Sequence, residues 1–80
     1  MVRLLLFARA RDLIGKESID FSCDTPTTVR NLRGRLTETY PKLKSLLESA
    51  AIAVNEVYAT DETLIRNDDT VAVIPPVSGG

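Results

Sequence analysis

The sequence has 80 residues, 44% of them hydrophobic, and a formal net charge of −1 from 10 basic and 11 acidic side chains. This length and composition predict one folded domain with a single small core, and they exclude a disordered chain. Without a basic excess to neutralise phosphates, we expect no nucleic acid among the partners. No stretch has the length of a membrane span or a signal peptide, so we expect a cytosolic protein that contacts no membrane.

Histidine is absent, and Cys23 is the only cysteine. The commonest general base and the commonest metal ligand are therefore missing, and one thiol cannot form a disulfide within the chain. We predict no metal site and no Ser/His or Cys/His nucleophilic site. A lone thiol is typical of a reducing compartment, and we interpret Cys23 as an ordinary residue at a strand end.

The first third of the chain predicts two strands separated by a helical turn. Residues 2–7 form a uniformly apolar run with one arginine, which favours a strand covered on both faces. Residues 8–14 favour a short helical turn that ends at Gly15, a natural C-cap. Residues 17–23 alternate polar and apolar side chains, which predicts a half-buried strand. Its inward residues are Ile19, Phe21 and Cys23.

The next segment predicts the main helix. Residues 24–28 have turn composition, and Thr28 is the expected N-cap. Apolar residues then recur at helical spacing in one stripe until Pro41 ends the helix. The stripe consists of Val29, Leu32, Leu36 and Tyr40. Three arginines lie off this stripe, and we interpret them as a solvated face rather than a phosphate site. They are Arg30, Arg33 and Arg35.

The second half predicts short elements joined by turns. Leucines within residues 43–47 indicate a second helical piece. Residues 51–54 and 57–59 predict a hairpin with Asn55-Glu56 at its turn. Residues 67–69 are typical of an Asx-rich turn. We prefer a turn to a calcium site here, because the spacing and the distal glutamate of a calcium-binding loop are absent.

Residues 71–74 predict the last strand. It and the first strand are the most uniformly apolar, which places them side by side in the centre of a sheet. Because the connection between them crosses over through the helix, we expect the pair to be parallel. The predicted fold class is α+β, a mixed four- to five-stranded sheet packed on one main helix. Residues 1–74 form the domain, and residues 75–80 form a C-terminal tail.

The tail reads Pro-Pro-Val-Ser-Gly-Gly. The prolines prevent the strand from continuing, and the glycines leave a thin, flexible tip with a terminal carboxylate. This pattern favours a carboxylate that enters a narrow pocket of another protein, although a frayed terminus remains an alternative. Residues 1–40 carry a net charge of +2 and residues 41–80 one of −3, so we expect the receiving pocket to be basic.

Blocks of sequence along the whole chain are similar to one known family. The blocks are residues 5–15, 28–33, 53–55, 69–72 and 75–80. The chain resembles the ubiquitin-like β-grasp family and, more narrowly, the small sulfur-carrier subunit of molybdopterin synthase, the MoaD type. The Gly-Gly ending is shared by all such carriers. The more specific signals are the complete Pro-Pro-Val-Ser-Gly-Gly ending and the Ala-Arg-Ala-Arg-Asp-Leu-Ile-Gly block.

The resemblance implies a role in molybdenum cofactor biosynthesis. A ubiquitin-activating-like adenylyltransferase would consume ATP to adenylate the carboxylate of Gly80, which then becomes a thiocarboxylate. The large synthase subunit would supply the active site, where the tail donates sulfur to the pyranopterin precursor. This chain would be the non-catalytic donor in a heterotetramer of two small and two large subunits. No permanently bound cofactor is implied, and the carried group is the glycyl thiocarboxylate.

A docking face follows from the strand pattern. If Val2, Leu4 and Leu6 face the helix, then Leu5 and Phe7 face outward. If Val71 and Val73 also point inward, then Ala72 and Ile74 share that outer face. Family members use an apolar patch here, often with an aromatic residue where this chain has Ile74. The residues expected to bind partners are Phe7, Tyr58, Ile74, Pro75, Pro76, Val77, Ser78 and Gly79. The alternative for Phe7 and Ile74 is a place in the core.

Three other functions remain open on the sequence. A related sulfur carrier for thiazole synthesis or tRNA thiolation would share the fold, tail and activation but use another acceptor. A ubiquitin-like modifier would instead join its tail to a lysine of a target protein. A passive interaction domain would have a tail without chemistry.

Overall fold

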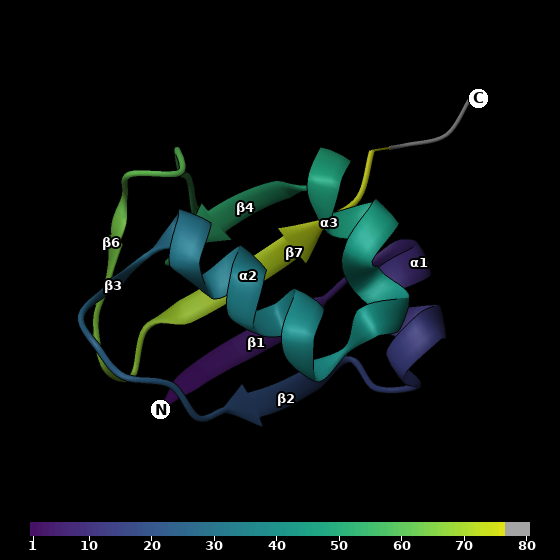
Figure 1. Ribbon diagram of the computed structural model, residues 1–80, viewed down its shortest axis with the longest axis horizontal. Coiled ribbons are helices and arrows are strands. Elements are labelled where there is room, and N and C mark those ends of the chain that lie inside the picture. The colour runs from purple at the N-terminus through teal and green to yellow at the C-terminus, as the bar shows by residue number, and fades with distance from the viewer. Residues whose placement is uncertain (77–80) are drawn as a thin grey trace.

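In the computed structural model, which describes residues 1–76, helices cover one face of a five-stranded mixed sheet (Figure 1). Along the chain the elements are β1 (Val2–Leu6), α1 (Ala8–Ile14), β2 (Ser18–Phe21), β3 (Thr27–Thr28), α2 (Val29–Thr39), the 3₁₀ helix η1 (Pro41–Leu43), α3 (Lys44–Ser49), β4 (Ala51–Val54), β5 (Val57–Tyr58), β6 (Leu64–Ile65) and β7 (Thr70–Ile74). Within residues 1–76, no helix is long and apolar enough to cross a membrane.

β1 and β7 form the centre of the sheet, whose strand order is β2-β1-β7-β4-β5. They pair in parallel, with Leu4 opposite Val71 and Leu6 opposite Val73. β2 and β4 flank them in antiparallel orientation, and β5 completes the edge as a hairpin with β4. The predicted parallel central pair and the α+β class are therefore confirmed. A mixed sheet that curves around one main helix is the β-grasp arrangement.

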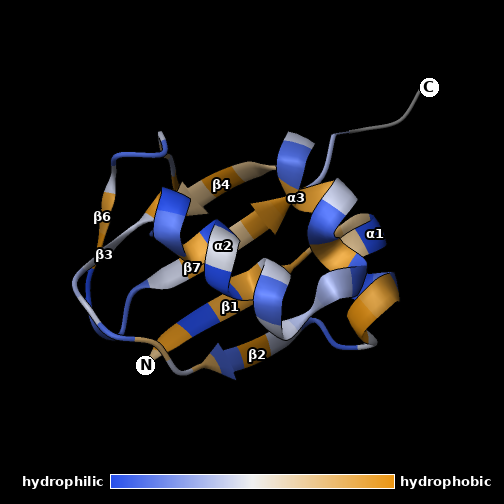
Figure 2. Cartoon of the chain, viewed as in Figure 1, coloured by the Kyte–Doolittle hydropathy of each residue, from blue (hydrophilic) through white to orange (hydrophobic). Residues whose placement is uncertain are grey.

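The core lies between the sheet and α2. β1 alternates as expected, with Val2, Leu4 and Leu6 at most 3% exposed. The α2 stripe meets them, since Val29 and Leu36 belong to the same buried cluster. Figure 2 shows hydrophobic residues along β1 and β7 and hydrophilic residues on the outer side of α2. Burial of this apolar stripe, more than helix propensity, holds so short a helix in place.

The predicted helix boundaries are confirmed. The Thr28 side chain accepts a hydrogen bond from the Asn31 amide at 3.2 Å and caps α2. Gly15 caps α1 in the left-handed conformation at φ 83°, and its amide donates to the Arg11 carbonyl at 2.7 Å. α2 ends at Thr39, two residues before Pro41.

Two short strands, β3 and β6, are absent from the prediction. They pair antiparallel as a separate two-stranded sheet, with Thr28 opposite Leu64. Two residues are too few for an alternating pattern, so no local signal marked either strand. The segment before β6 also completes the start of α2, because its carbonyls accept hydrogen bonds from the first amides of the helix. The bonds are Val29 N to Thr63 O and Arg30 N to Asp61 O, each 3.0 Å.

Candidate functional site

The outer face of the sheet, opposite α2, carries a shallow hollow of about 560 Å³, here called the sheet-face hollow. Strands β1, β4, β5 and β7 all contribute to it. Its lining residues are Leu5, Phe7, Ala53, Asn55, Glu56, Tyr58, Thr70, Ala72 and Ile74. The hollow is thus mainly apolar at its centre and polar along one edge, as is usual for a surface that binds another protein.

The structure brings together the three family-matched positions of the expected docking face. Phe7 follows β1, Tyr58 lies in β5 and Ile74 ends β7, and all three line the sheet-face hollow. Phe7 is 45% exposed and Tyr58 is 74% exposed, while Ile74 is half-buried. None of the three belongs to the buried core, so the alternative that Phe7 and Ile74 are core residues is wrong.

Small residues in neighbouring strands make the hollow. Ala53 lies opposite Ala72 on one side and opposite Tyr58 on the other. Two methyl groups side by side, with larger side chains around them, leave space on an otherwise filled face. Ala53 was not among the residues expected to bind partners. The two-residue turn at residues 55–56 could have indicated it, because a tight hairpin fixes which residues pair and so places Ala53 opposite Tyr58.

The polar edge of the hollow is a hydrogen-bonded cluster built on Asn55 and Asp69. Asn55 donates to the Asp69 carboxylate at 3.1 Å and accepts from the Thr70 amide at 3.0 Å. Asp69 also accepts from the Arg66 amide at 2.8 Å. The β4–β5 turn has positive φ at Asn55 (49°) and Glu56 (71°), as a tight hairpin requires. The cluster therefore ties this turn to the start of β7.

The pKa of the Asp69 carboxyl is lowered, first by the hydrogen bond from the Arg66 amide and then by that from Asn55. A carboxyl with a lower pKa in the folded state stabilises the fold above its ordinary pKa, and that stabilisation is lost as the pH falls through the folded pKa. We therefore expect Asp69→Asn to lose less stability than the parent protein between about pH 6 and about pH 3. Urea unfolding across this range measures the difference.

Asp68→Asn is the matched control, because this neighbouring carboxylate accepts no side-chain hydrogen bond among the described residues. It should follow the pH dependence of the parent protein. Equal dependence in Asp69→Asn and the parent would show that the cluster does not stabilise the charged carboxylate.

The base of the tail lies in a second hollow of about 610 Å³, here called the exit hollow. Pro75 is buried in it and Pro76 is exposed. The other lining residues come from α1 and α3. They are Ala8, Arg9, Asp12, Ser45, Leu46 and Ser49. The remaining predicted tail residues, Val77, Ser78, Gly79 and Gly80, lie outside the described residues.

The charge around the exit differs from the expectation drawn from the two halves of the sequence. The charged residues that line the exit hollow are one arginine and one aspartate, Arg9 and Asp12. Two acidic residues of the second half, Asp61 and Glu62, instead form ion pairs with α2. The charged side chains that line the exit hollow therefore balance one another. The basic receiving pocket stays a prediction.

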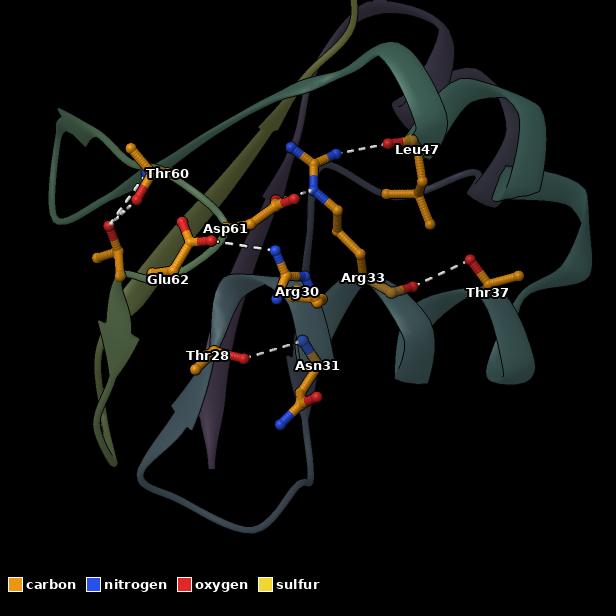
Figure 3. A network of polar contacts seen from close by, with 10 residues as sticks. Thr28, Arg30, Asn31, Arg33, Thr37, Leu47, Thr60, Asp61 and Glu62 are labelled. Atoms are coloured by element: carbon orange, nitrogen blue, oxygen red, sulfur yellow. Dashed lines mark hydrogen bonds and ion pairs between the residues drawn. The ribbon is translucent and has the colours of Figure 1, made fainter.

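The interpretation of the α2 arginines as a solvated face is wrong for Arg33. Its side chain is only 25% exposed and pairs with Asp61 at 3.2 Å, while its guanidinium also donates to the Leu47 carbonyl. Arg30 makes a 3.0 Å ion pair with Glu62, but both side chains are more than 60% exposed. Figure 3 shows the guanidinium of Arg33 between Asp61 and Leu47.

Comparison with known proteins supports the family resemblance over nearly the whole chain. The sequence profile of the ThiS family matches residues 4–80. A molybdopterin synthase sulfur carrier subunit from Dictyostelium discoideum is 42% identical over an alignment of 82 residues, which covers 98% of this chain and 94% of that protein.

Two solved structures share the fold. The small archaeal modifier protein 1 from Methanosarcina acetivorans has a TM-score of 0.81 at 28% identity, covering 99% of this chain and 95% of its own. A chain in the complex of subunits 1 and 2 of the molybdopterin-converting factor from Helicobacter pylori has a TM-score of 0.70 at 28% identity, covering 99% of this chain and 97% of its own. The protein described here belongs to the ThiS family, and it is a relative of the molybdopterin synthase sulfur carrier subunits.

Proposed function

We propose that this protein is the sulfur carrier subunit of a molybdopterin synthase. The observation that carries the proposal is the match along nearly the full length of both proteins to a molybdopterin synthase sulfur carrier subunit. Its similarity to a chain in the complex of subunits 1 and 2 of a molybdopterin-converting factor supports a large-subunit partner. The heterotetramer, the ubiquitin-activating-like adenylyltransferase and the cytosolic location belong to the same proposal.

The proposed chemistry takes place at the Gly80 carboxylate. The carboxylate attacks the α-phosphate of ATP and releases pyrophosphate, which gives an acyl-adenylate with AMP as a good leaving group. The terminal sulfur of a persulfide then displaces AMP and forms an acyl disulfide. A second thiol attacks the persulfide's inner sulfur, forms a disulfide with it and releases Gly80 as a thiocarboxylate. This group is a soft nucleophile that needs no histidine in the carrier. Its sulfur attacks the pyranopterin precursor and forms a thioester, and water then cleaves the acyl C–S bond, which leaves the sulfur on the precursor and returns the Gly80 carboxylate.

The sheet supports delivery of this group. β7 lies between β1 and β4, so the strand that leads into the tail is hydrogen-bonded on both sides. Ile74 lies in the sheet-face hollow, and the next residue, Pro75, lies in the exit hollow. A partner that covers the sheet-face hollow would therefore be next to the base of the tail. The five residues 76–80 reach at most about 17 Å when extended, enough to enter a partner's active site.

The decisive experiment is intact mass measurement after incubation with the activating enzyme, ATP and a persulfide donor. We expect a mass increase equal to the replacement of one oxygen by sulfur, located at Gly80 by fragmentation. The carrier with the Gly80 thiocarboxylate, mixed with the large subunit and the pyranopterin precursor, should then yield the dithiolene of molybdopterin. No mass increase would refute a sulfur carrier, and charging without dithiolene formation would indicate another acceptor, as in thiazole synthesis or tRNA thiolation.

A protein modifier is the second candidate, because the archaeal structure with the same fold is named a modifier protein. A modifier would transfer its activated carboxyl to a lysine amine, with loss of AMP. The same incubation with cell extract would then give larger species joined through an isopeptide bond. The absence of such species, together with the thiocarboxylate, would exclude this candidate.

A further inference from the structure

Arg33 connects three segments that are distant in the sequence. From the middle of α2 its guanidinium reaches Asp61, in the loop before β6, and the Leu47 carbonyl of α3. These partners are 28 and 14 residues away. The network is drawn in Figure 3, where the Arg33 side chain extends across the gap between α2 and α3. Neither docking nor sulfur chemistry at Gly80 accounts for this arginine.

The Leu47 carbonyl is one of the last four of α3, which runs from Lys44 to Ser49. Such carbonyls have no partner within the helix, and a guanidinium that donates to one of them caps the helix end. A helix of 6 residues is too short to be stable by itself, so its position depends on contacts of this kind. Asp61 neutralises the half-buried charge that makes the contact.

α3 in turn forms one wall of the exit hollow. Ser45, Leu46 and Ser49 line this hollow together with Pro75 and Pro76. The chain continues from α3 through buried Ala50 into β4, where Ala51 pairs with Ile74, the last residue before the prolines. A shift of α3 would therefore be transmitted to the base of the tail both through the wall and through this strand pair.

We propose that Arg33 is a positioning residue that holds α3 against the base of the tail and so aims the reactive end of the carrier. The proposal rests on the proposed sulfur-carrier function. Arginine suits this task because its planar guanidinium donates in two directions at once, to a carboxylate and to a carbonyl. A lysine ammonium on a flexible stem does not hold two partners in a fixed geometry in the same way.

The test compares Arg33→Met with Arg30→Met. Both substitutions remove an arginine of α2 and its ion pair with the same loop, but only Arg33 contacts α3. With saturating large subunit, Arg33→Met should lower the single-turnover rate of sulfur transfer at least about tenfold, since displacement of the reacting atom by about 1 Å can cost a hundredfold. The Kd for the large subunit should change less than about threefold, because the sheet-face hollow is untouched. Arg30→Met should retain the parent rate.

Hydrogen exchange tests whether Arg33 holds α3 in place, independently of sulfur chemistry. The Ala50 amide donates to the Leu46 carbonyl at the end of α3. Its exchange should be faster in Arg33→Met, with the Leu32 amide of α2 as the internal reference for global stability. Asp61→Asn keeps the backbone bond to Arg30 and should show a smaller change in the same direction. Arg33→Lys should resemble Arg33→Met.

Equal transfer rates in Arg33→Met and Arg30→Met, whether slowed or not, would overturn the positioning role of Arg33. Unchanged exchange of the Ala50 amide in Arg33→Met would overturn this role as well. In either case, sulfur transfer by the parent protein would leave the proposed function intact. If the parent protein never acquires a thiocarboxylate, the proposed function fails first, and the exchange data still show whether Arg33 holds α3.

Discussion

Removal of Gly80 should abolish sulfur transfer and leave the domain folded. The deletion moves the terminal carboxylate by about 3.3 Å along the tail, far beyond the placement error that a reacting group tolerates. The core is built from residues between Val2 and Val73, so the free energy of unfolding should change by no more than about 0.5 kcal/mol. Urea unfolding measures the stability, and single-turnover assays with the purified large subunit measure the transfer.

The same experiment contains its own control. Binding of the large subunit by the shortened chain should remain within about tenfold of the parent Kd, because the deletion leaves the sheet-face hollow unchanged. A chain extended by one glycine should also lose transfer, since its carboxylate is misplaced in the opposite direction. Full activity of either variant would show that the position of the terminal carboxylate does not determine sulfur delivery.

Phe7→Ala should weaken binding of the large subunit by about 2 kcal/mol, which corresponds to about 30-fold in Kd. The ring is 45% exposed and lines the sheet-face hollow next to the base of the tail. Burying an aromatic ring in a partner's pocket is among the largest single contributions to an interface. Isothermal titration calorimetry with the purified large subunit measures the change.

Leu64→Ala is the matched control for this substitution. Leu64 is a large apolar residue exposed to a similar degree, 49%, but it lies in β6 of the separate two-stranded sheet. Its substitution should leave the Kd within about threefold of the parent value. Similar losses in both variants would indicate a general effect on the domain, and no loss in Phe7→Ala would place the docking surface elsewhere.

Patterns that span one turn or one strand were predictable from the sequence. The Thr28 cap, the Gly15 C-cap and the apolar alternation of β1 each depend on residues within a few positions of one another. The parallel pairing of β1 and β7 also followed, because a crossover through a helix leaves few other arrangements for two buried strands. The family resemblance depended on such blocks and on the Gly-Gly ending.

Contacts between distant segments required the tertiary structure. The partners of Arg33 lie 14 and 28 residues away, and Asn55 meets Asp69 across 14 residues. No local pattern distinguishes such a residue from a solvated one, because its partners are determined by how helices and strands pack. The helix periodicity, the helix caps and the pairing of the central strands were therefore determined by the sequence alone. Packing determined the two hollows and the contacts of Arg33 with Asp61 and Leu47, because each of these exists only where separate elements meet.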